Sequence, residues 1–150
     1  MSDRAAVLPV DLDHVPPETF RQVVVYLDDV LRECQLVLVS QGQGRAVGVE
    51  LADIASGLVP DIEEIGDAFR AAEATTNDDG TLHLQGALTA TQASLIGSLQ
   101  LRLVQVRQLG RRGALLLESD PQVIQLMVWI WEEISDQLHG RAPRPYAHAR

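Results

Sequence analysis

The chain has 150 residues, of which 46% are hydrophobic, and a formal net charge of −9. This length suits one domain, because a folded chain of about 150 residues hides roughly 68–70% of the surface that it exposes when unfolded. The negative charge argues against general affinity for nucleic acid or anionic membranes, which attract positive surfaces. Residues 1–9 do not resemble a signal peptide, and no stretch approaches the twenty apolar residues of a membrane span. We therefore expect a cytoplasmic protein.

The first predicted helix follows residues 1–15, which we expect to be a flexible N-terminal segment. Pro16-Pro17-Glu18 favours a helix start, because proline fits the first turn and the acid lies near the positive end of the helix dipole. Apolar residues then recur at spacings of three and four as far as about Ser40, which places them on one face. This stripe consists of Phe20, Val24, Leu27, Leu31, Cys34 and Leu38, and Val23, Val30 and Val37 widen it to the breadth typical of a helix packed in a bundle. Cys34 is the only cysteine, and we expect a buried, inert thiol.

A second helical region covers about residues 47–74. Its apolar residues again recur at spacings of three and four, and they are Leu51, Ile54, Leu58, Ile62, Ile65, Phe69 and Ala72. Pro60 removes a backbone donor, so we expect this region to be kinked or split there. The composition of residues 77–80 predicts a turn. Residues 81–85 alternate like a short strand, but a strand needs a partner and none is evident nearby.

Two further helices are predicted in the second half of the chain. Thr89 and Gln92 fit a capping box at the start of a helix that closes near Gly110. Asp120-Pro121 begins a last helix, which runs to about Leu138. Its apolar residues wrap more than one face, so this helix is either central in a bundle or covered by a second subunit.

These segments predict an all-α fold, a bundle of four to five amphipathic helices over residues 16–139. Residues 140–150 hold three arginines, two prolines and no acid, so we expect a disordered basic tail. A solvated tail is one interpretation, and an arm that docks on an acidic partner is the other.

Charge is segregated between the second and third helical regions. The second region is acidic, whereas Arg102, Arg107, Arg111 and Arg112 follow the third helix. Opposite charges favour these two helices as neighbours, within one chain or across a dimer. An anion site is the alternative, but phosphate-binding loops place glycines before a helix, and Gly110 and Gly113 come after one.

The sequence holds no recognisable catalytic or metal-binding motif. Glu132, Asp136 and His139 share a helix face, but the Glu-x-x-His motif of di-iron bundles is absent. No serine or cysteine lies in a nucleophile motif. We therefore interpret the acidic face as solvated, and we expect no enzyme activity, cofactor or metal.

Trp129 and Trp131 are the aromatic candidates for an interface. Two residues apart on a helix, their side chains point about 200° apart, so both enter one core only if the helix is enclosed on two sides. One of them then marks an interface. The alternative is a surface tryptophan that lies flat over its neighbours.

Three segments, residues 26–36, residues 108–116 and residues 120–133, resemble the helical regulatory region of actinobacterial ATP-binding proteins. Those proteins are similar to anti-sigma-factor and sensor kinases of the GHKL ATPase class, and the resemblance spans about residues 20–138. It implies a sensing or coupling module in bacterial signalling. Neither the asparagine-bearing helix motif nor the Asp-x-Gly-x-Gly loop of such kinases is present, so no kinase activity is implied.

The sequence thus predicts a homodimeric, non-enzymatic regulatory protein that binds a signalling partner through helical surfaces. We place the interface at the tryptophans and arginines of the last two helices, namely Trp129, Trp131, Arg107, Arg111 and Arg112. The alternative is a small-molecule binding domain, in which an apolar cavity uses Arg102 or Arg107 to hold an anionic ligand.

Overall fold

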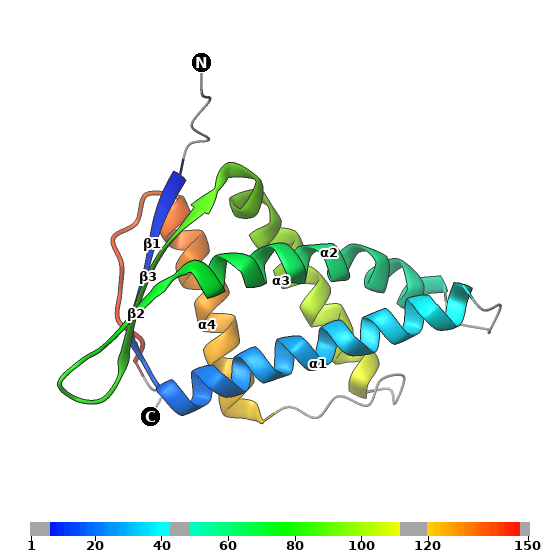
Figure 1. Cartoon of the computed structure of the whole chain (residues 1–150), viewed down its shortest axis with the longest axis horizontal. Helices are drawn as coiled ribbons and strands as arrows, with labels where there is room; N and C mark the ends of the chain where they lie inside the picture. Colours follow the sequence, from blue (N-terminus) through cyan, green and yellow to red (C-terminus); the bar gives the residue numbers. More distant parts are fainter. Residues whose placement is uncertain (1–6, 43–48, 112–119, 148–150) are drawn as a thin grey trace, which may run out of the picture.

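The computed structural model describes residues 7–42, 49–111 and 120–147. Helices and strands follow one another as β1 (Val7–Val15), α1 (Pro17–Gly42), α2 (Val49–Ala71), β2 (Glu73–Thr76), β3 (Leu82–Thr89), α3 (Ala90–Arg111) and α4 (Pro121–Leu138). The strands form one antiparallel sheet in the order β1-β3-β2. The sheet lies at one end of the molecule, and α1 and α2 extend away from it side by side (Figure 1). The prediction of an all-α bundle is therefore wrong.

The sheet depends on a pairing between distant parts of the chain. Residues 81–85 do lie in or beside a strand, and β3 finds one partner in the hairpin strand β2, where Thr76 pairs with Leu82. Its other partner is β1, where Val7 pairs with Thr89. Residues 7–15 were expected to be flexible, but they pair with β3 along one edge and bury Val10, Leu12 and Val15.

The predicted helix starts are confirmed. Thr89 and Gln92 form the capping box, because each side chain accepts the other's backbone N–H at 3.1 and 3.0 Å. Asp120 caps α4 by accepting the N–H of Gln122 at 2.8 Å. The α2 helix continues through Pro60, so the expected split into two helices is absent.

An ion pair beside this proline joins α2 to α3. Arg102 contacts the carboxylate of Asp61 and donates to the carbonyl of Gly57 at 3.4 Å. A β-carbon at Gly57 would lie 2.6 Å from the guanidinium carbon of Arg102, so glycine makes room for the arginine. This contact confirms that the acidic and basic helices are neighbours.

The core lies where the four helices meet the sheet. The largest contribution comes from α4, whose buried residues are Val123, Ile124, Leu126, Met127, Ile130, Trp131, Glu133 and Ile134. This confirms the central position for the last helix. None of the four helices in the described ranges is long and apolar enough to cross a membrane.

The buried face of α1 is offset from the predicted stripe. Its buried residues are Val23, Tyr26, Val30 and Cys34. Cys34 belongs to the narrow stripe, Val23 and Val30 belong to its predicted widening, and only Tyr26 lies outside both. Burial raises the pKa of the Cys34 thiol to about 11, and the charge of Glu33 adds to the effect. The thiol is buried as predicted, whereas Phe20, Val24, Leu27 and Leu31 lie on the flank of α1 that faces α2.

Candidate functional site

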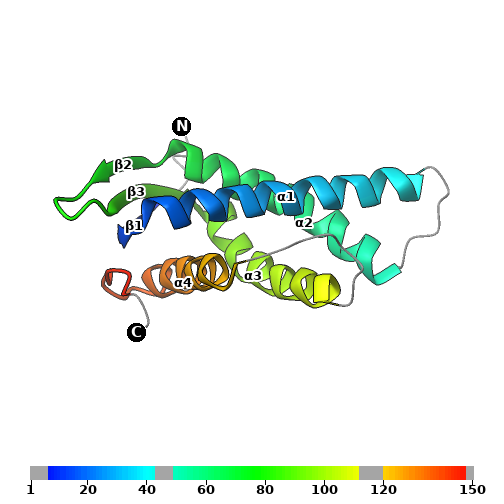
Figure 2. The same ribbon diagram turned by 90° about the horizontal axis from the view of Figure 1, so that it is seen from below.

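The stripe on α1 forms one wall of a groove between α1 and α2. The groove has a volume of about 190 Å³ and is lined by Phe20, Val24, Leu27, Asp28, Leu31, Ile62, Glu63, Ile65, Gly66, Phe69, Arg70, Leu99 and Trp131. The two helices run alongside each other in both ribbon views (Figures 1 and 2). We call this feature the α1–α2 groove.

The α1 wall is apolar and incompletely covered. Val24 is 40% exposed, and Leu27 and Leu31 are half-buried. Phe20 and Leu31 stand at the two ends of this wall, and a helix rises about 1.5 Å per residue, so the wall is about 16 Å long. The packing of α1 through its offset face leaves this second apolar face accessible.

Aromatic rings line the inner part of the groove. The ring centroids of Phe20 and Phe69 lie 6.2 Å apart, and Phe69 meets Trp131 edge-on at 5.9 Å. Trp131 is only 1% exposed, yet its indole N–H has no hydrogen-bond partner among the described residues. A buried donor without a partner lowers stability by roughly 1–3 kcal/mol. This unsatisfied polar group lies beside the groove.

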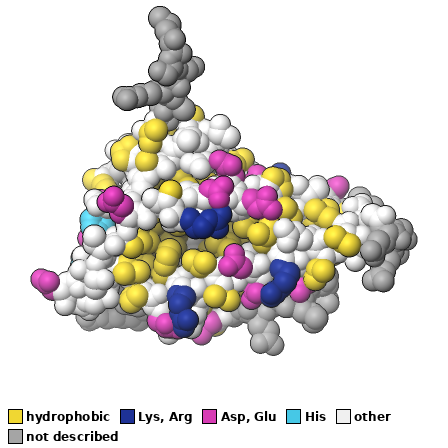
Figure 3. Space-filling view, viewed as in Figure 1, with side chains coloured by type: hydrophobic (Ala, Val, Ile, Leu, Met, Phe, Trp, Pro, Cys, Tyr) yellow, Lys and Arg dark blue, Asp and Glu magenta, His cyan; other side chains and the backbone are white. Residues whose placement is uncertain are grey.

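The mouth of the groove is acidic. Asp28 on α1 and Glu63 on α2 are exposed lining residues. Asp67 is ion-paired with Arg70, and both side chains are about two-thirds exposed. Because Asp67 offsets the charge of Arg70, Asp28 and Glu63 leave the groove with a negative charge. Figure 3 shows hydrophobic side chains in the space between the two helices, bordered by charged side chains of both signs.

The structure places the two tryptophans of the predicted interface in different surroundings. Trp131 lies at the floor of the groove, whereas Trp129 is half-buried and its ring meets that of Tyr146 at 5.0 Å. Arg107 is half-buried, and its charge partly offsets the burial that raises the pKa of Tyr26. Arg111 ends α3 with a side chain outside the described part, and Arg112 lies outside the described residues.

The basic tail docks on acids of its own chain. The backbone N–H of Arg144 donates to the buried carboxylate of Glu133 at 2.8 Å, and its guanidinium contacts Asp136 at 2.7 Å. The backbone N–H of Tyr146 donates to the carbonyl of Asp13 at the end of β1, at 2.9 Å. Residues 140–146 are therefore held against the body of the protein, in contrast to the expected disorder.

A side-chain amide closes the free edge of β1. Gln137 accepts the backbone N–H of Asp11 at 2.9 Å and donates to the carbonyl of the same residue at 2.7 Å. An open edge strand offers its backbone groups to other chains, and this double hydrogen bond occupies one such pair.

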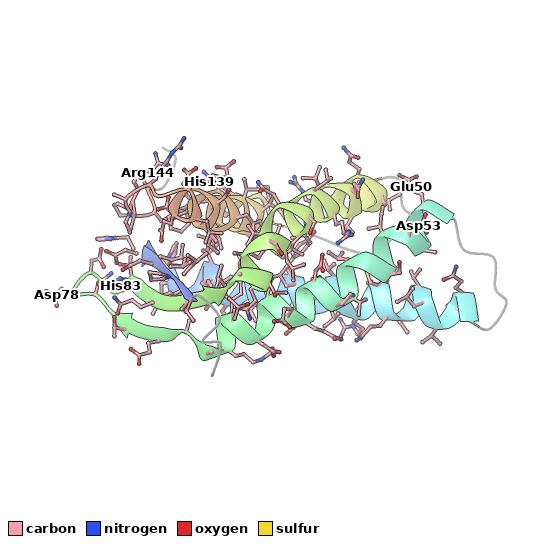
Figure 4. The ribbon with its side chains drawn as sticks, turned by 90° about the horizontal axis from the view of Figure 1, so that it is seen from above. Glu50, Asp53, Asp78, His83, His139 and Arg144 are labelled. Carbon is pink, nitrogen blue, oxygen red and sulfur yellow. The ribbon has the colours of Figure 1, made fainter. Side chains whose placement is uncertain are left out.

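His83 and His139 lie in separate places and make separate contacts. Figure 4 shows His83 on β3 and His139 after α4, while Glu50 lies at the start of α2 at the far end of the molecule. His83 contacts Asp11, and the ring of His139 bonds the carbonyl of Ser135 at 2.7 Å. In the described ranges, no three His, Cys, Asp or Glu side chains are grouped to hold a metal ion.

Comparisons with models of protein families, with curated proteins and with solved structures found no match to this chain. The α1–α2 groove is therefore interpreted from its own geometry. Sequence analysis found the residues of its α1 wall but assigned them to the core, because spacing shows that residues share a face and does not show what covers it.

Proposed function

We propose that this protein is a non-enzymatic regulator that binds a signalling partner through the α1–α2 groove. The occupant is an amphipathic helix of the partner, which inserts large apolar side chains and carries basic residues beside them. The observation that carries this proposal is an apolar groove between two helices with an acidic mouth. A helix laid in a hydrophobic groove is a common mode of peptide recognition.

The size of the groove favours side chains over a separate ligand. Pockets for drug-sized molecules measure about 300–1,000 Å³, whereas this groove measures about 190 Å³. The smaller volume suits one or two anchor side chains of a helix. The wall of about 16 Å corresponds to roughly three helical turns, which is enough to meet anchors on successive turns.

Charge defines the kind of helix. Asp28, Glu63 and Asp67 outnumber Arg70 at the mouth, and the whole chain carries a net charge of −9. Lysine or arginine beside the anchors would complement this mouth. Such complementarity chiefly raises the association rate and excludes acidic competitors.

The alternative of an anionic small molecule finds less support. It needs a cavity that contains Arg102 or Arg107, and neither residue lines the α1–α2 groove. Arg102 is already held by Asp61. The cation at the groove is Arg70, and Asp67 neutralises it.

The signalling context rests on the resemblance of residues 26–36, 108–116 and 120–133 to helical regulatory regions of GHKL-type signalling proteins. That resemblance also supports a bacterial partner in the cytoplasm. The groove and its charge support binding of a helix, whichever protein supplies that helix.

Two labelled helical peptides test the proposal by fluorescence anisotropy. The basic peptide carries leucines at i, i+3, i+4 and i+7 with lysines on the flanks, and the second peptide replaces every lysine with glutamate. We expect the basic peptide to bind and the acidic peptide to bind at least about tenfold more weakly, a difference of about 1.4 kcal/mol. Salt should weaken the binding of the basic peptide.

A matched pair of variants locates the binding site. Val24 lines the groove, whereas its neighbour Val25 does not, and they are 40% and 53% exposed. Val24→Gln should weaken binding of the basic peptide about tenfold, and Val25→Gln should leave its binding unchanged. Equal binding of the two peptides, or equal effects of the two variants, would contradict the proposed groove.

A further inference from the structure

The outer face of α3 carries an uncharged stripe. Its members lie at spacings of three and four and are all exposed: Ser94, Gly97, Leu101, Val104 and Gln108. Leu101 is 61% exposed and Val104 is 42% exposed. Leu99, two residues before Leu101 and so about 200° around the helix, lines the α1–α2 groove. The α3 stripe therefore faces away from the groove.

The absence of charge sets this stripe apart from the exposed apolar residues on the outer face of α1. On α1, the exposed Val25 and Leu36 share their face with Asp29 and Arg32, which form an ion pair of 2.6 Å. In contrast, α3 contains no acidic residue along its whole length. In a chain with a net charge of −9, a helix without acids is where two copies meet with little repulsion.

We propose that the α3 stripe is the interface of a symmetric homodimer in which the two α3 helices run antiparallel. A two-fold axis places the same surface of both copies together, so an interface that held acids would bring like charges close. The uncharged stripe satisfies this requirement. Because it faces away from the groove, the dimer leaves both grooves open.

The stripe also specifies its own register. With the axis midway between residues 102 and 103, Leu101 lies opposite the partner's Val104, and Gly97 lies opposite the partner's Gln108. A β-carbon at Gly97 would meet nothing within 4 Å, so this position leaves room for the long glutamine side chain. The same register repeats both contacts on the other side of the axis.

The arginines on α3 favour the antiparallel arrangement. Arg102 is held by Asp61 and does not reach across the axis. In the proposed register, Arg107 lies opposite position 98, which is a serine. Parallel helices would instead place Arg107 beside the same residue of the second copy and bring like charges together.

Sedimentation equilibrium over a range of protein concentrations tests the interface. We expect the unmodified chain to form a dimer and Leu101→Glu to raise the dimer dissociation constant at least about tenfold. The control is Leu36→Glu on α1, because Leu36 is similarly exposed at 55%. It should leave the dimer intact. A monomeric unmodified chain, or equal effects of the two variants, would overturn the proposal.

A mixture of two variants tests the register. Leu101→Glu and Val104→Lys should each weaken the homodimer, whereas their mixture should recover a heterodimer, because the antiparallel register places the new carboxylate opposite the new amine. Parallel helices would give no recovery, which would overturn the antiparallel arrangement. Leu101→Glu should still bind the basic peptide, so failure of the dimer and failure of the groove are distinguishable.

Discussion

Two regions of this molecule differ in how far their surfaces are covered by other residues of the chain. On the β1 side, residues 140–146 and Gln137 cover the strand edge, and the buried Glu133 accepts hydrogen bonds from Gln137 and Arg144. On the side of α1 and α2, an apolar wall is open and the indole N–H of Trp131 has no partner among the described residues. The chain covers part of the β1 edge with its own residues and leaves the α1 wall accessible.

This contrast distinguishes residues whose side chains are satisfied within the chain from residues that a partner could cover. The buried carboxylate of Glu133 is fully engaged within the chain, so a partner has nothing to add there. At the α1–α2 groove, exposed valine and leucine surface is still in contact with water. Burial of apolar surface yields about 25 cal/mol per Å², so a partner gains affinity by covering it.

The largest expected effect distinguishes the two tryptophans. Trp131 is in the core, and Trp131→Ala should lower the free energy of unfolding by about 3–5 kcal/mol. Trp129→Ala should cost about 1–2 kcal/mol, because Trp129 is half-buried and loses mainly its contact with Tyr146. Urea denaturation measures both values. Equal losses would show that the C-terminal segment contributes as much as the groove floor.

The thiol of Cys34 tests how tightly the inner face of α1 is closed. Its pKa rises from 9.0 to about 11 in the folded state. The contribution of the thiol to stability is therefore full below pH 9. Between pH 9 and 11 the thiol ionises only in the unfolded chain, so the free energy of unfolding falls by roughly 1–3 kcal/mol.

The control for this pH dependence is Cys34→Ala, which should flatten the decrease. Burial also raises the pKa of Tyr26, so part of the decrease should remain above pH 10. Urea denaturation at several pH values measures the difference between the two proteins. An identical slope of the free energy of unfolding against pH in the two proteins would contradict a closed inner face of α1.

Arg102 forms a partly buried ion pair and Arg70 forms an exposed one, so the loss of each arginine should affect stability differently. Arg102→Ala should lower the free energy of unfolding by about 2 kcal/mol, because it removes the cationic partner of Asp61, which is only 7% exposed. Arg70→Ala should cost less than about 0.5 kcal/mol, because its pair with Asp67 is exposed. Arg70→Ala should also strengthen binding of the basic peptide, since the mouth becomes more acidic. Weaker binding would contradict electrostatic complementarity.

The last comparison concerns the edge of strand β1. Gln137→Ala removes two hydrogen bonds to Asp11 and one to Glu133, which still accepts the backbone N–H of Arg144, and we expect a loss of about 1 kcal/mol. Hydrogen exchange at the Asp11 amide should become faster. Gln35→Ala, at an exposed position on α1, should change neither quantity. An unchanged exchange rate at Asp11 would mean that other contacts protect the edge.

Local signals in the sequence identified the helices well. The capping box at Thr89 and the cap at Asp120 involve residues within three positions of one another, so their geometry follows from the sequence. The charge contrast between α2 and α3 also predicted their contact correctly. In both cases a few residues determine the structure without reference to the rest of the chain.

The sheet and the groove depend on contacts that are distant in sequence. Strand β3 alternates visibly, but its partner Val7–Val15 precedes it by more than sixty positions, and no local pattern links them. Apolar residues surround α1 on more than one face, so spacing alone did not distinguish the buried face from the one that lines the groove. Packing of the other helices made that choice.

Methyl NMR of the protein during titration with the basic leucine and lysine peptide tests the central claim most directly. We predict shifts at groove methyl groups, namely those of Leu27, Ile62 and Leu99, and unchanged methyl groups of Val10 and Leu12 on β1. Val24→Gln should reduce the shifts at equal peptide concentration. Shifts at β1 without shifts at the groove, or no shifts at all, would contradict partner binding through the α1–α2 groove.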